Sequence, residues 1–109
     1  MASVLLVDDD RALRKLLRAY LEEESISVLE AGSGEEGLAT IERMRPDLVL
    51  LDVRLPGIDG FEVLRRLSGL DSGPAVMLVT SLEDDVDQLV AYRLGAVDFV
   101  TKPVSPKLL

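Results

Sequence analysis

Short apolar runs alternate with segments of helical periodicity along this chain. Most of the runs are continuous, which is typical of strands covered on both faces, and they lie at 4–7, 26–29, 48–51, 75–79 and 97–100. Between them, apolar residues recur at the three- and four-residue spacing of amphipathic helices. Strict alternation with short joints predicts a parallel sheet wrapped by helices on both faces. We therefore expect a doubly wound, five-stranded α/β fold.

Capping signals mark where the helices begin and end. The fourth helix, over 86–94, should end at Gly95, because glycine tolerates the left-handed conformation after a helix. Ser105-Pro106 opens a fifth helix, which the sequence cuts short at Leu109. The signals for the first three helices are Asp10 as an N-cap, Ser33 with Glu36 as a capping box, and Asp59 with Glu62 as a cap.

The same spacing predicts which side chains of each helix face the sheet. In the first helix these are Leu13, Leu16, Leu17, Tyr20 and Leu21, with Arg14, Lys15, Arg18 and Glu22 on the other side. In the second and third helices they are Leu38, Ile41 and Met44, then Phe61, Leu64 and Leu67.

Composition excludes several classes of function. The 109 residues suit one domain, and 48% of them are hydrophobic, so a packed core is expected. No apolar run approaches the roughly 20 residues of a membrane span, and the N-terminus lacks the basic region of a signal peptide. The net charge of −8 disfavours nucleic acid and anionic membranes as direct partners. Cysteine and histidine are absent, which fits a cytoplasmic protein without thiolate or imidazole metal ligands.

Polar side chains stand at the carboxyl ends of four of the predicted strands. They are Asp8-Asp9-Asp10, Asp52, Thr80-Ser81 and Thr101-Lys102. Open α/β sheets bind ligands at this edge. One lysine cannot neutralise three carboxylates there, whereas a divalent cation can. An all-oxygen set of ligands favours Mg²⁺ or Mn²⁺ over zinc.

Each of these residues also has a purely structural interpretation. Asp10 is most simply an N-cap. Asp8 and Asp9 would serve as solvated turn residues, Asp52 would merely end a strand, and Thr80 would be a β-branched strand residue. The acids of 83–87 suit the start of a helix, where the macrodipole favours negative charge.

The residues VDDD, LLDVRLPGIDG, a strand that ends in Thr80, and GAVDFVTKP together resemble the receiver domain of bacterial two-component response regulators. The resemblance covers nearly the whole chain, in the right order and spacing. It implies a flavodoxin-like, CheY-like fold and a single receiver domain over 1–109.

The resemblance also implies roles for individual residues. Asp52 resembles the phosphoacceptor, and Lys102 the lysine that binds the phosphoryl group. Thr80 and Phe99 resemble the switch residues. The implied ligands of Mg²⁺ are Asp8, Asp9, Asp52 and the main-chain carbonyl of Arg54.

The implied function is phosphorelay signalling. The donor would be a phosphohistidine on a sensor histidine kinase or a histidine phosphotransfer protein. Phosphorylation would switch the surface of the fourth helix, fifth strand and fifth helix to control an output domain or target protein outside this chain. Such a domain is not an enzyme, although it assists its own phosphorylation and dephosphorylation.

Two other functions are compatible with parts of the sequence. Asp8 and Asp10 form the D-x-D of a dehalogenase-type phosphohydrolase, but Arg11-Ala12 lacks the threonine expected there. A receiver-like module with a silent site is the second alternative. The short fifth helix would also leave an apolar face open, so we expect this form to associate as a homodimer.

Overall fold

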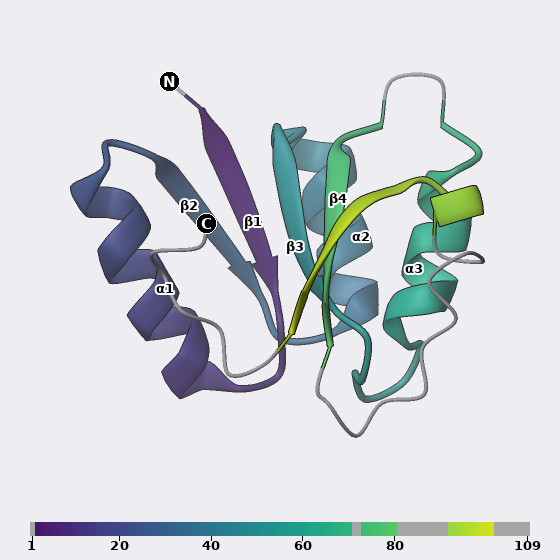
Figure 1. Cartoon of the computed structure of the whole chain (residues 1–109), viewed down its shortest axis with the longest axis horizontal. Helices are drawn as coiled ribbons and strands as arrows, with labels where there is room; N and C mark the ends of the chain where they lie inside the picture. Colours follow the sequence, from purple (N-terminus) through teal and green to yellow (C-terminus); the bar gives the residue numbers. More distant parts are fainter. Residues whose placement is uncertain (1, 71–72, 81–91, 102–109) are drawn as a thin grey trace.

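The protein forms one parallel sheet of five strands with helices on both faces (Figure 1). The structure, a computed structural model, describes residues 2–70, 73–80 and 92–101. The strands are β1 Ser3–Val7, β2 Ser27–Ala31, β3 Leu48–Asp52, β4 Ala75–Thr80 and β5 Ala96–Thr101. The helices are α1 Arg11–Glu23, α2 Gly34–Met44 and α3 Gly60–Leu67.

The strand order is β2-β1-β3-β4-β5, so all strands stay parallel but the side on which new strands are added changes between β1 and β3. From β1 the chain passes to β2 on one side, and from β2 it crosses to β3 on the other. A doubly wound sheet has its ligand crevice at the carboxyl ends of the two strands where the order reverses. This topology confirms the predicted fold and brings the ends of β1 and β3 together.

Two apolar layers flank the sheet because alternate residues of each strand point to opposite faces. In β1, Val4 and Leu6 pack with Leu17 and Leu21 of α1. Leu5 and Val7 lie in the other layer, with the apolar side chains of α2 and α3. Figure 1 shows α1 standing apart from α2 and α3. The continuous apolar runs are therefore strands buried on both faces.

The face that α1 turns to the sheet differs from the prediction. Leu17 and Leu21 are buried, but Leu16 is 55% exposed. Arg14, expected on the solvent side, has a side chain only 16% exposed and lies toward β2. In α2, Met44 is likewise 50% exposed. The helical spacing is right, but the position of the sheet under the helix decides which residues at the edge of the apolar stripe are covered.

The three predicted N-caps are present. The side chains of Asp10, Ser33 and Asp59 accept hydrogen bonds from the backbone N–H groups of Leu13, Glu36 and Glu62, at 3.1, 3.2 and 2.9 Å. These bonds satisfy donors that a helix leaves unpaired at its first turn.

In a capping box the glutamate at the third helical position accepts a hydrogen bond from the backbone N–H of the N-cap residue. Neither Glu36 nor Glu62, which both lie in the described part of the chain, makes this bond. The carboxylate of Glu36 accepts from the N–H of Gly32 at 3.3 Å. Glu62 pairs instead with Arg65 and Arg66, at 2.6 and 2.8 Å. Hydrogen bonds from Arg65 and then Arg66 lower the pKa of Glu62 to about 2. Because these two ion pairs are open to water, their contribution to the stability of the fold is small.

The second strand extends to Ala31, two residues beyond its predicted end, because β2 pairs with β1 along its whole length, from Ser3 opposite Ser27 to Val7 opposite Ala31. Gly95 ends a helix as predicted, since its φ is +109° and its N–H donates to the carbonyl of Tyr92 at 3.0 Å. Most of the predicted fourth helix and all of the fifth lie outside the described residues. Over the parts of the chain that the structure describes, none of the helices has the length and apolar character to cross a membrane.

Candidate functional site

Three carboxylates meet where β1 and β3 end. One oxygen each from Asp8, Asp9 and Asp52 lie within 4.8 Å of one another. Asp8 is 6% exposed and Asp52 3% exposed, whereas Asp9 is exposed. Asp10, although next in sequence, serves as the N-cap of α1. The predicted meeting of the Asp8, Asp9 and Asp52 carboxylates is confirmed, and so is the capping role of Asp10.

Backbone hydrogen bonds hold Asp8 in the turn between β1 and α1. Its N–H donates to the carbonyl of Ala31 at 3.1 Å, which continues the pairing of β1 with β2. Its Oδ1 accepts from the N–H of Asp10 at 2.9 Å. The turn therefore ends the strand, orients the Asp8 carboxylate and starts α1 within three residues.

Asp52 is held by the segment that joins β3 to α3. Its Oδ1 accepts from the N–H of Arg54 at 3.3 Å. The N–H of Val53 donates to the carbonyl of Val79 at 3.1 Å, and the carbonyl of Val53 accepts from the N–H of Gly60 at 2.9 Å. The start of α3 thus lies directly against the backbone that carries Asp52.

Gly60 permits this close approach, and we expect Gly60→Ala to destabilise the protein. A Cβ at this position would lie 2.4 Å from the carbonyl oxygen of Asp52 and 2.8 Å from the Cα of Val53. Both are backbone atoms, which cannot move aside as a flexible side chain would. Overpacking of this kind costs about 1–3 kcal/mol, which denaturant titration would measure.

Gly69→Ala is the matched control for this prediction. The nearest atom to a Cβ there is the carbonyl oxygen of Arg66 at 3.8 Å, an ordinary contact. Stability close to wild type is expected for Gly69→Ala. Equal stability of the two variants would show that α3 can move away from Asp52 at no cost.

The carboxylate cluster is able to hold a metal ion. Two unit charges about 4 Å apart repel by roughly 4 kcal/mol at an effective dielectric of about 20. A cation between them reverses the sign of that energy. All three side chains offer only oxygen, the ligand that hard divalent cations prefer. The donor set therefore fits Mg²⁺ or a similar ion.

The backbone places the two predicted switch residues on β4, which pairs with β3, and on β5, which pairs with β4. Thr80 is the last residue of β4 and pairs with Thr101 of β5, while Phe99 pairs with Leu78. The side chains of Thr80 and Phe99, and the whole of Lys102, lie outside what the structure describes. Their roles stay predictions.

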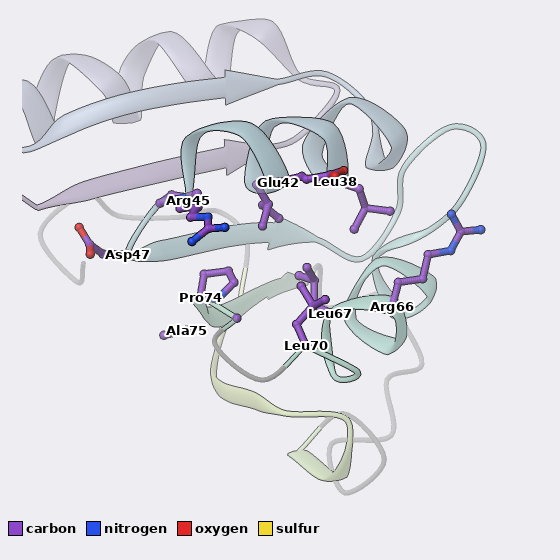
Figure 2. Close-up of a pocket in the computed structure, with 12 residues that line it drawn as sticks. Leu38, Glu42, Arg45, Asp47, Arg66, Leu67, Leu70, Pro74 and Ala75 are labelled. Atoms are coloured by element: carbon purple, nitrogen blue, oxygen red, sulfur yellow. The ribbon is translucent and has the colours of Figure 1, made fainter.

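A large groove in the molecule lies at the other end of the sheet (Figure 2). It has a volume of about 890 Å³ and runs past Asp47 and Ala75, which stand at the amino ends of β3 and β4. Leu38 and Glu42 of α2 line one side, and Leu67 and Leu70 the other. The groove is therefore separate from the carboxylate cluster.

Comparison with known proteins identifies the family. A family model described as "Response regulator receiver domain" matches residues 4–109. The chain belongs to this family. The receiver domain is 47% identical over 109 residues to the transcriptional regulatory protein AfsQ1 of Streptomyces coelicolor, covering 100% of the chain and 48% of that protein. It is 40% identical over 106 residues to the DNA-binding response regulator MtrA of Mycobacterium tuberculosis H37Rv, covering 97% and 46%.

Solved structures agree with this assignment. A CheY-like receiver domain protein of Methanospirillum hungatei superposes with a TM-score of 0.90 at 33% identity, over 98% of this chain and 86% of that one. The BeF3-activated receiver domain of Klebsiella pneumoniae RstA gives 0.86 at 35% identity, over 97% and 90%. The receiver domain is thus a phosphorelay signalling module rather than a classical enzyme, and it spans about half the length of the curated relatives.

Sequence reasoning missed two residues that shape the site. Gly60 lies within the LLDVRLPGIDG segment, but only its closeness to the Asp52 backbone explains why this position lacks a side chain. Helical spacing places Arg14 on the solvent-facing side of α1, yet its guanidinium donates to the main-chain carbonyl of Asp8. Nothing in the spacing of charges along α1 distinguishes Arg14 from Lys15 or Arg18.

Proposed function

We propose that Asp52 is the phosphoacceptor of this receiver domain. A carboxylate oxygen of Asp52 forms the new bond to phosphorus as the bond to the donor imidazole nitrogen breaks, and the imidazole keeps that electron pair. The chain has no histidine, so the donor is a phosphohistidine of a sensor histidine kinase or a histidine phosphotransfer protein. Support comes from the burial of Asp52 and its place beside Asp8 and Asp9.

Asp8, Asp9, Asp52 and the main-chain carbonyl of Arg54 are the proposed ligands of Mg²⁺, with Mn²⁺ as a substitute. The ion, when bound, neutralises charge on the transferring phosphoryl group. The role of the protein's own residues is to hold Asp52 in place through the N–H of Arg54 and to keep Asp8 and Asp9 beside it. Positioning and electrostatics supply most of the rate in such transfers.

Lys102, Thr80 and Phe99 complete the proposed mechanism. Lys102 follows β5 and would bind the phosphoryl oxygens. The hydroxyl of Thr80 would then hydrogen-bond the phosphoryl group, and Phe99 would turn inward, which changes the surface around β5 and the helices beside it. The signal is a shift in the populations of two states. The same groups let the domain assist its own phosphorylation and dephosphorylation.

The output is proposed to lie outside these residues. The relatives named above are called a transcriptional regulatory protein and a DNA-binding response regulator, and the receiver domain covers about half of each. An output domain or a separate target protein would read the changed surface. The charge of −8 argues against nucleic-acid binding by the receiver domain itself. We propose that a receiver domain with this phosphorelay role is cytoplasmic.

The observation that carries this proposal is the meeting of Asp8, Asp9 and Asp52 oxygens within 4.8 Å. Incubation with acetyl phosphate and Mg²⁺, followed by intact-mass measurement, tests it. We expect one phosphoryl group per chain, and none when EDTA removes the metal. Continuous turnover of a phosphate ester would indicate a phosphohydrolase instead, and absence of uptake would indicate a silent module.

A further inference from the structure

Arg14 connects the metal-binding turn to the neighbouring strand. One guanidinium nitrogen, Nη1, donates to the main-chain carbonyl of Asp8. Another, Nε, donates to Oε1 of Glu30 in β2 at 3.0 Å. The Arg14 side chain is mostly buried between α1 and the sheet. It therefore spans the turn after β1 and the edge strand β2.

Glu30 is in turn held by a second arginine of the same helix. Nη1 of Arg18 donates to Oε2 of Glu30 at 2.7 Å, and Arg18 also pairs with Glu22 at 3.4 Å. Burial raises the pKa of Glu30, but hydrogen bonds from Arg18 and Arg14, with their charges, outweigh it and lower that pKa. Glu30 is thus ionised at neutral pH and anchors Arg14 with a charge-assisted bond.

We propose that Arg14 is a positioning residue for the acid pair, Asp8 and Asp9. The N–H of Asp8 is fixed by the carbonyl of Ala31, and its carbonyl is fixed by Arg14. Because the peptide bond is planar, fixing the carbonyl of Asp8 also fixes the N and Cα of Asp9. The Arg14 guanidinium thereby sets how the two carboxylates are presented. This inference rests on the proposed metal site.

Charge alone predicts the opposite effect. Arg14 is a cation close to the site, and a nearby positive charge weakens the binding of a divalent cation. If Arg14 acted only through its charge, its removal would tighten Mg²⁺ binding. If it positions the turn, its removal weakens Mg²⁺ binding, because the ligand oxygens are then less well preorganised. The sign of the change therefore separates the two roles.

The test compares Arg14→Gln with Arg18→Gln. Arg18 lies on the same helix, carries the same charge and bonds the same Glu30, but it pairs with Glu30 and Glu22 rather than with the Asp8 carbonyl. Isothermal titration with Mg²⁺ gives the dissociation constant, and metal-free melting checks that each variant folds. We expect binding about tenfold weaker for Arg14→Gln, the lower end for loss of an outer-shell partner. Arg18→Gln should bind like wild type.

Glu30→Gln provides a second route to the same answer. It leaves Arg14 and both acids in place but removes the charged anchor, so Mg²⁺ binding should weaken less than in Arg14→Gln. Unchanged or tighter binding in a folded Arg14→Gln overturns the inference. If that variant does not fold, wild-type affinity in Glu30→Gln overturns it. Lack of Mg²⁺ binding by the wild type would instead overturn the proposed metal site, and this inference with it.

Discussion

Asp52→Asn should take up no phosphoryl group under conditions in which the wild type takes up one. Asparagine has nearly the same shape as aspartate, so the 3%-exposed site should stay packed. Its neutral amide is not a nucleophile toward phosphorus, however, and the acyl phosphate cannot form. Intact-mass measurement after acetyl phosphate and Mg²⁺ would report the loss directly.

Asp10→Asn is the matched control for this experiment. Asp10 is an exposed aspartate close to Asp8 in sequence, and its side chain caps α1 through the N–H of Leu13. Asparagine caps helices as well as aspartate does, so this variant should fold and be phosphorylated like the wild type. Labelling of Asp52→Asn to the wild-type level would mean that another residue is the acceptor.

Mg²⁺ should raise the melting temperature of the wild type, and Asp9→Asn should abolish most of that gain. A ligand at 100 times its dissociation constant stabilises a folded protein by about 2.7 kcal/mol. For a domain of this size that corresponds to roughly 10 °C or more. Asp9→Asn should also melt higher than the wild type without metal, because it removes one of three mutually repelling charges.

Asp9 is a better position than Asp8 for this substitution. Asp8 is buried and its Oδ1 accepts the N–H of Asp10, so its replacement disturbs the turn as well as the charge. Asp9 is exposed. Scans with NaCl at matched ionic strength separate site binding from screening. A wild-type melting temperature that does not respond to Mg²⁺ would contradict a cation site at these three acids.

Much of the fold could be predicted because its signals are local. A continuous apolar run such as residues 48–51 is recognisable without knowing its neighbours, and so is a capping serine such as Ser33. The strict alternation of strands and helices then leaves few topologies. The meeting of Asp8 and Asp52 follows, because both stand at carboxyl ends of parallel strands.

The sequence predictions differ from the structure where a residue's environment depends on an element that is distant in the sequence. Leu16 and Arg14 both flank the apolar stripe of α1, and helical spacing does not distinguish them. The sheet lies so that Arg14 is covered and Leu16 is left in water. In the same way, β2 runs on to Ala31 because β1 offers it partners to that point.

The sequence by itself determined the chemistry of the site: three carboxylates at the ends of two strands, with no histidine or cysteine to compete as ligands. Only the tertiary structure decided how those acids are held. Asp8 and Asp52 are buried while Asp9 is exposed, and Arg14 reaches the carbonyl of Asp8. The physical reason is that every residue has a main-chain carbonyl, so a hydrogen bond to one needs no particular residue type at the acceptor. Such a contact therefore leaves no signal in the sequence and is seen only in the folded chain.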